Sequence, residues 1–106
     1  MIGKVFVLGS KEAVVGFRLA GIRGEVVEDR EMALKLFKRV FSSGDYRLLI
    51  VTEGVARFLR SEIEEAKARK LFPLVVEVPD RGGFREKPSD FLERMIKEAL
   101  GLGFER

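Results

Sequence analysis

The chain contains three short apolar runs, and each is followed by a longer stretch whose apolar residues have the spacing of a helix. The runs are Val5–Leu8, which ends at Gly9, Arg47–Val51, and Leu74–Val78, which lies between two prolines. Continuous apolar runs of this length are typical of strands that are buried on both faces, as in a parallel sheet. A fourth run, residues 24–28, is shorter and more polar, which favours an edge strand.

The stretches between these runs carry helix signals. Ser10 can cap a helix over residues 11–20, and Asp29 can cap one that continues to about Ser42. Thr52 can cap a third helix that runs to about Lys70. Ser89 can cap a last one that ends near Leu100. The apolar residues of each stretch recur at the spacing of one helix face.

This alternation predicts a small α/β fold. Parallel strands joined by helices place those helices on both faces of the sheet. We expect a doubly wound sheet of four parallel strands in the order 2-1-3-4, the flavodoxin- or receiver-like arrangement. The 106 residues then form a single domain, with residues 79–88 as an exposed loop and 89–106 as a C-terminal helix and tail.

The sequence lacks several residue types that enzymes commonly use for catalysis or metal binding. The chain has no cysteine and no histidine, which removes thiolate sites and the usual acid–base group at neutral pH. Acidic and basic residues alternate along most segments, so the net charge of +3 does not predict a nucleic-acid surface. We expect no cofactor and no membrane insertion, because no apolar run is long enough to span a bilayer. The start of the chain does not resemble a signal peptide, which favours the cytoplasm.

The turn after the first strand is where doubly wound folds bind phosphates, and Gly9-Ser10 lies there. The glycine-rich dinucleotide pattern and the P-loop pattern are both missing around it. A receiver domain would need an aspartate at the end of the third strand, where this chain has Thr52-Glu53. Glu77 is an acid among valines, and we expect it to point outward from an edge strand. Tyr46 is expected to close a turn.

Three segments together resemble the F subunit of the archaeal/vacuolar-type (A/V-type) ATP synthase. They are residues 16–22 (Gly-Phe-Arg-Leu-Ala-Gly-Ile), 48–53 and 73–79. The resemblance implies a non-catalytic subunit of the central rotor stalk. Such a subunit binds the coiled-coil D subunit, turns inside the ring of A and B subunits, and is peripheral to the membrane. Two departures are Ser10, where the family often has an acid, and the basic net charge.

Two groups of residues are candidates for the partner interface. Val55, Arg57 and Phe58 combine an apolar helix face with an arginine, a composition that is enriched at binding hot spots. The second group, in the C-terminal segment, is Phe91, Met95, Leu102 and Phe104. An equally simple interpretation is that Phe58 is a core residue and that the tail frays. The alternative function is a stand-alone receiver-like signalling or small-ligand-binding module that has no phosphoacceptor.

Overall fold

The computed structural model describes residues 2–80. In chain order these residues form η1 (Ile2–Lys4), β1 (Val5–Gly9), α1 (Lys11–Leu19), β2 (Arg23–Val26), α2 (Arg30–Ser43), β3 (Leu48–Thr52), α3 (Glu53–Phe58), α4 (Arg60–Ala68) and β4 (Leu74–Val78). Of the expected loop over residues 79–88, only the first two residues are described, and the expected helix and tail over residues 89–106 lie outside the described part of the chain.

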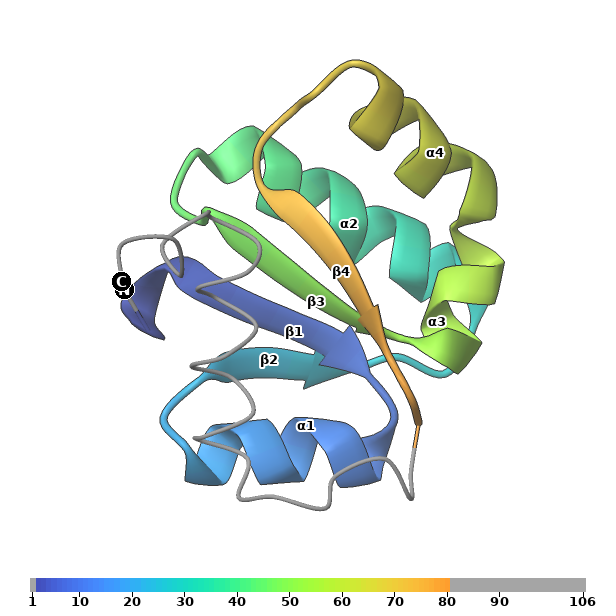
Figure 1. Ribbon diagram of the computed structural model, residues 1–106. Coiled ribbons are helices and arrows are strands. Elements are labelled where there is room, and N and C mark those ends of the chain that lie inside the picture. The colour runs from blue at the N-terminus through green and yellow to red at the C-terminus, as the bar shows by residue number, and fades with distance from the viewer. Residues whose placement is uncertain (1, 81–106) are drawn as a thin grey trace.

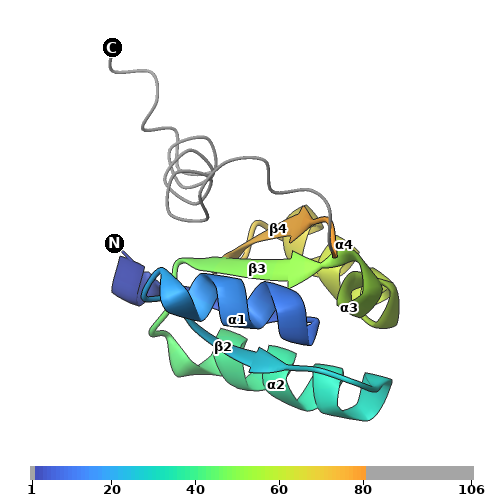
Figure 2. The ribbon, with the colours of Figure 1, turned by 90° about the horizontal axis from the view of Figure 1, so that it is seen from below.

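The four strands form one all-parallel sheet in the order β2-β1-β3-β4, as Figure 1 shows. This confirms the expected fold class and strand order. Leu49 pairs with Phe6 on one side and with Val75 on the other. The strand β3 therefore lies inside the sheet, and β2 and β4 are its two edges (Figure 2).

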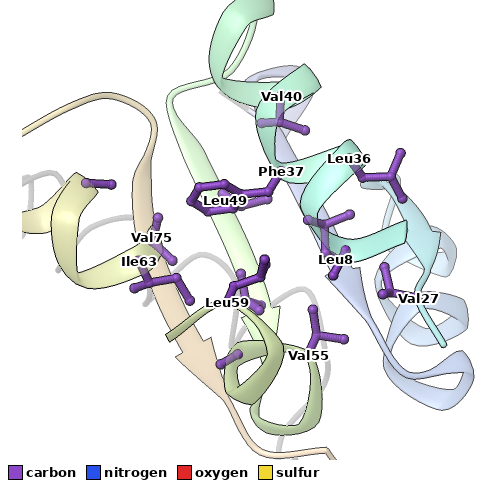
Figure 3. Close-up of a cluster of buried hydrophobic side chains, with 14 residues drawn as sticks. Leu8, Val27, Leu36, Phe37, Val40, Leu49, Val55, Leu59, Ile63 and Val75 are labelled. Atoms are coloured by element: carbon purple, nitrogen blue, oxygen red, sulfur yellow. The ribbon is translucent and has the colours of Figure 1, made fainter. Parts of the chain in front are cut away.

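Helices cover both faces of the sheet. One cluster joins α1 to the sheet; its buried members are Val5, Val7, Val14, Phe17, Ile22, Leu48, Ile50 and Val78. The other cluster lies between the sheet and α2, α3 and α4. Its largest members include Leu8, Leu36, Phe37, Leu49, Leu59 and Ile63, all of which Figure 3 labels. Because side chains alternate along a strand, neighbours such as Leu49 and Ile50 contribute to opposite clusters.

The ends of α1 and α2 follow the expected capping chemistry. The Ser10 hydroxyl accepts a hydrogen bond from the Ala13 amide at 3.4 Å, and the Asp29 carboxylate accepts one from the Met32 amide at 2.8 Å. Gly44 ends α2 in the left-handed conformation, with φ of 73°. The second strand begins one residue earlier than expected and ends at Val26, which shortens it to four residues.

The third helix differs from the expectation of one helix that runs to about Lys70. The chain instead leaves helical geometry at Leu59, with φ −118° and ψ 24°, and then begins α4. The Leu59 amide donates to the Ala56 carbonyl at 3.0 Å, and the Leu59 carbonyl accepts from the Ile63 amide at 2.8 Å. The break lets α3 contact β1, β3 and β4, while α4 lies along β4. Leu59 is fully buried in the cluster between these helices and the sheet.

Candidate partner interface

Doubly wound folds bind ligands at the carboxyl edge of the sheet, so the polar groups there are the first candidates for a site. Two of them, Ser10 and Asp80, cap the N-termini of helices. Ser10 caps α1, as described above. The Asp80 carboxylate, just after β4, accepts a hydrogen bond from the Gly54 amide at 3.0 Å and so caps α3 from outside that helix.

Thr52 occupies the N-cap position of α3, but its side chain does not cap the helix, so that expectation is wrong. Its hydroxyl oxygen is fully buried and has no hydrogen-bond partner among residues 2–80. The side chain packs against Gly9 instead: a β-carbon on that glycine would come within 2.5 Å of Thr52 Cγ2. The space beside Gly9 is therefore filled by Thr52, and a phosphate could not approach the glycine from that side.

Glu77 is the one acid on β4, and it does not simply project into solvent. Its side chain is only 29% exposed and forms a two-pronged ion pair with Arg60, at 2.5 Å and 3.1 Å. The hydrogen bonds from Arg60 hold the pKa of the Glu77 carboxyl below its ordinary value, against an opposing effect of partial burial. Arg60 also lies 3.9 Å from Glu64. The pair joins the first turn of α4 to the edge strand, which is a structural use of the carboxylate.

Within residues 2–80, no group of three or more acidic, histidine or cysteine side chains is placed to hold a metal ion. In the same part of the chain, no helix has both the length and the apolar character needed to cross a membrane. At the carboxyl edge Ser10 and Asp80 thus cap helices and Thr52 is buried against Gly9. The candidate binding surfaces lie among the exposed apolar and charged groups.

The first predicted interface group lies on α3. Val55 is only 3% exposed and belongs to the core, so its side chain is not accessible to a partner. Arg57 is exposed, and Phe58 is partly buried with its side chain packed against the core. Arg57 and Phe58 therefore present a charged and an aromatic group at the edge of the helical layer. The second group, Phe91, Met95, Leu102 and Phe104, lies outside the described residues.

A second apolar surface was missed by the sequence analysis. Leu71 and Phe72, between α4 and β4, are 41% and 56% exposed. A hollow of about 560 Å³ lies on the β4 side of them and one of about 430 Å³ lies on the α2 side. The sequence carried a signal, since two large apolar residues precede a proline in a connection between elements.

The fold and its surfaces define a class: a doubly wound α/β module in which Ser10 and Asp80 at the carboxyl edge cap helices and in which large apolar side chains such as Phe72 are exposed. The family model described as ATP synthase (F/14-kDa) subunit matches residues 5–96. The chain belongs to this family of ATP synthase subunits, as the resemblance in the sequence indicated.

Curated relatives agree over nearly their whole length. The F subunit of the A-type ATP synthase of Methanothermobacter thermautotrophicus is 35% identical over 103 residues, which cover 96% of each chain. The corresponding protein of Methanocaldococcus jannaschii is 32% identical over 93% of this chain and 96% of its own. That of Pyrococcus furiosus is 30% identical over 97% of this chain and 99% of its own.

Proposed function

We propose that this chain is a non-catalytic subunit of the central rotor stalk of an A/V-type ATP synthase, where it binds the D subunit and turns with it inside the ring of A and B subunits. Its location would be cytoplasmic and peripheral to the membrane. The observation that carries the proposal is the surface of α3, where exposed Arg57 adjoins partly buried Phe58. Arginine and aromatic residues together are enriched at protein–protein hot spots.

The chemistry of the carboxyl edge favours this proposal over a small-ligand module. Ser10 and Asp80 already bind backbone amides, and Thr52 fills the space against Gly9. A signalling or ligand-binding module would leave such groups free for its ligand. Titration with ATP and Mg²⁺ in a calorimeter separates the two functions: a micromolar dissociation constant would favour the ligand module.

The direct test is co-purification of the chain with the D subunit of the same complex, followed by a Phe58→Ala variant. If Phe58 is an anchor, the variant weakens D binding by more than about 1 kcal/mol, roughly fivefold. Leu34→Ala is the matched control, because Leu34 is also partly buried on a helix that packs against the same core cluster. Equal loss of D binding in both variants would mean that Phe58 acts only through stability.

The proposal extends to the C-terminal segment, which lies outside the structure described above. We expect deletion of residues 89–106 to leave D binding largely intact and to change the ATPase rate of the assembled complex. An unfolded truncated chain, or an unchanged rate, would assign those residues to the core or to no regulatory role.

A further inference from the structure

The connection between α4 and β4 places two large apolar side chains in solvent, Leu71 and Phe72. Hollows lie on both sides of them. One is lined mainly by the connection itself, the end of α4 and the edge strand β4; the other lies between α2 and α4, where Phe37 and Phe41 contribute to the lining. Both hollows share Leu71, Phe72 and Ala66, so they form one continuous surface, here called the Phe72 groove.

The exposed ring of Phe72 has a stabilising neighbour within the chain. The Arg47 guanidinium lies 5.3 Å from the ring centroid, a cation–π arrangement. An aromatic side chain that is already ordered loses less conformational freedom when a partner covers it. Phe72 therefore has the properties of a binding anchor.

The charges around the Phe72 groove are not balanced. The acids that line it are already paired: Glu65 with Arg69 at 3.3 Å, and Glu62 with Arg30 at 3.5 Å. The lysines that line it are Lys38, Lys67 and Lys70. Over residues 2–80, none of the three has a carboxylate within ion-pair distance, although Lys67 acts on Glu77 through longer-range charge. The rim therefore carries positive charge that no acid of residues 2–80 pairs.

Lys70 is also in an unusual backbone conformation. Its φ is 54°, the left-handed region, in a C-terminal motif where Leu71 donates to the Ala66 carbonyl and Lys70 donates to the Lys67 carbonyl. The equivalent position after α1 is Gly21, with φ of 91°. Glycine occupies such positions without a steric penalty, whereas lysine does not. A side chain kept at a conformational cost beside an apolar groove indicates a function for that side chain.

We propose that the Phe72 groove docks an amphipathic helix of another subunit of the synthase, with apolar residues over Leu71 and Phe72 and acidic residues against Lys38, Lys67 and Lys70. A hollow between two helices fits the side-chain ridges of a third helix. The unpaired lysines select carboxylates on the flanks of that helix. The proposal depends on the chain's membership of a multi-subunit synthase, and it does not involve Arg57 or Phe58.

The test is photo-cross-linking in the assembled synthase. Phe72 is replaced by p-benzoylphenylalanine, the complex is purified and irradiated, and the cross-linked peptides are identified by mass spectrometry. We expect a cross-link to an acidic, helical segment of another subunit. The control is the same replacement at Leu19, an 85% exposed side chain on α1. A cross-link only within the chain, to a second copy of it, or to a segment without acids would overturn the proposal, as would a yield no higher than at Leu19.

Charge variants test the role of the lysines in the same assay. Lys67→Glu with Lys70→Glu should lower the cross-link yield from Phe72 at least about fivefold. Lys4→Glu with Lys11→Glu changes the net charge equally at exposed positions elsewhere and should leave the yield unchanged. Lys70→Gly removes the steric cost of the left-handed backbone at this position and should still reduce the cross-link yield. If Lys70 had only a structural role, the variant would not lower the yield. If D binds normally while these variants have no effect, the proposed function stands and this inference fails.

Discussion

The Thr52 hydroxyl is a buried polar group that has no hydrogen-bond partner in the described part of the chain, and such a group costs free energy on folding. Valine has nearly the same shape and has no polar atom to leave unsatisfied. We therefore expect Thr52→Val to raise the free energy of unfolding by about 1 kcal/mol, measured by chemical denaturation. Thr52→Ser, which keeps the hydroxyl and removes the methyl group beside Gly9, should instead lower it. A destabilising Thr52→Val would mean that the hydroxyl is bonded in solution.

Lys70 provides a second prediction about a single residue. Because glycine adopts the left-handed conformation freely, Lys70→Gly should raise the free energy of unfolding by about 1 kcal/mol. The matched control is Lys67→Gly, inside α4, which should lower it by about 1 kcal/mol because glycine is a poor helix former. Thermal or urea denaturation of the two variants gives the comparison, and equal effects would remove the evidence for strain at Lys70.

At the scale of elements, the Arg60–Glu77 pair connects α4 to β4 and should make their association sensitive to pH. The pKa of Glu77 is lowered in the folded state, and the hydrogen bonds that it accepts from Arg60 are the largest cause. Its contribution to stability is therefore fully present above the carboxyl's ordinary pKa and is lost as the pH falls through the folded value. The difference in stability between the wild type and Glu77→Gln should shrink between about pH 6 and about pH 3.

The measurement is denaturant unfolding of both proteins across that range. Glu64→Gln is the control, because Glu64 lies farther from Arg60, at 3.9 Å, and is more exposed. A gap between the wild type and Glu77→Gln that grows on acidification would contradict the assigned sign.

The elements that sequence analysis predicted well are those whose signal is local. The strands β1, β3 and β4 are dense apolar runs, and Asp29 is a cap with its helix directly after it. The break at Leu59 was not predictable in this way. Leucine is a good helix former, and the residues around it continue the helical spacing. The break buries Leu59 and lets α3 contact three strands while α4 lies along β4, which is a property of the packed fold.

The candidate interface illustrates the same limit. Arg57 and Phe58 were proposed from residue type and spacing and stay a prediction; Arg57 is exposed and Phe58 is partly buried. The burial of Val55 and the exposure of Phe72 depend on which segments pack over them. The spacing of apolar residues along one helix does not predict that packing. Lys70 appears ordinary in the sequence, and only its backbone angle marks it.

The whole molecule combines a charge-rich surface with a composition that has few thermally labile groups. The sequence contains no asparagine or glutamine, and 35% of its residues are charged. Ion pairs gain importance at high temperature because the cost of removing charges from water falls. We expect a melting midpoint above about 80 °C by calorimetry. A midpoint in the ordinary mesophilic range would contradict this inference and would leave the functional proposal untouched.

The all-parallel sheet has a mechanical consequence. The strand β1 begins at the amino end of the sheet and β4 finishes at its carboxyl end, with β3 hydrogen-bonded between them. A pull applied between Val5 and Val78 therefore acts along the strands and tries to slide them past one another. The hydrogen bonds of a parallel ladder are evenly spaced, so they share such a load and fail together. Along this line the domain behaves as a stiff link that resists stretching until one of the two ladders shears.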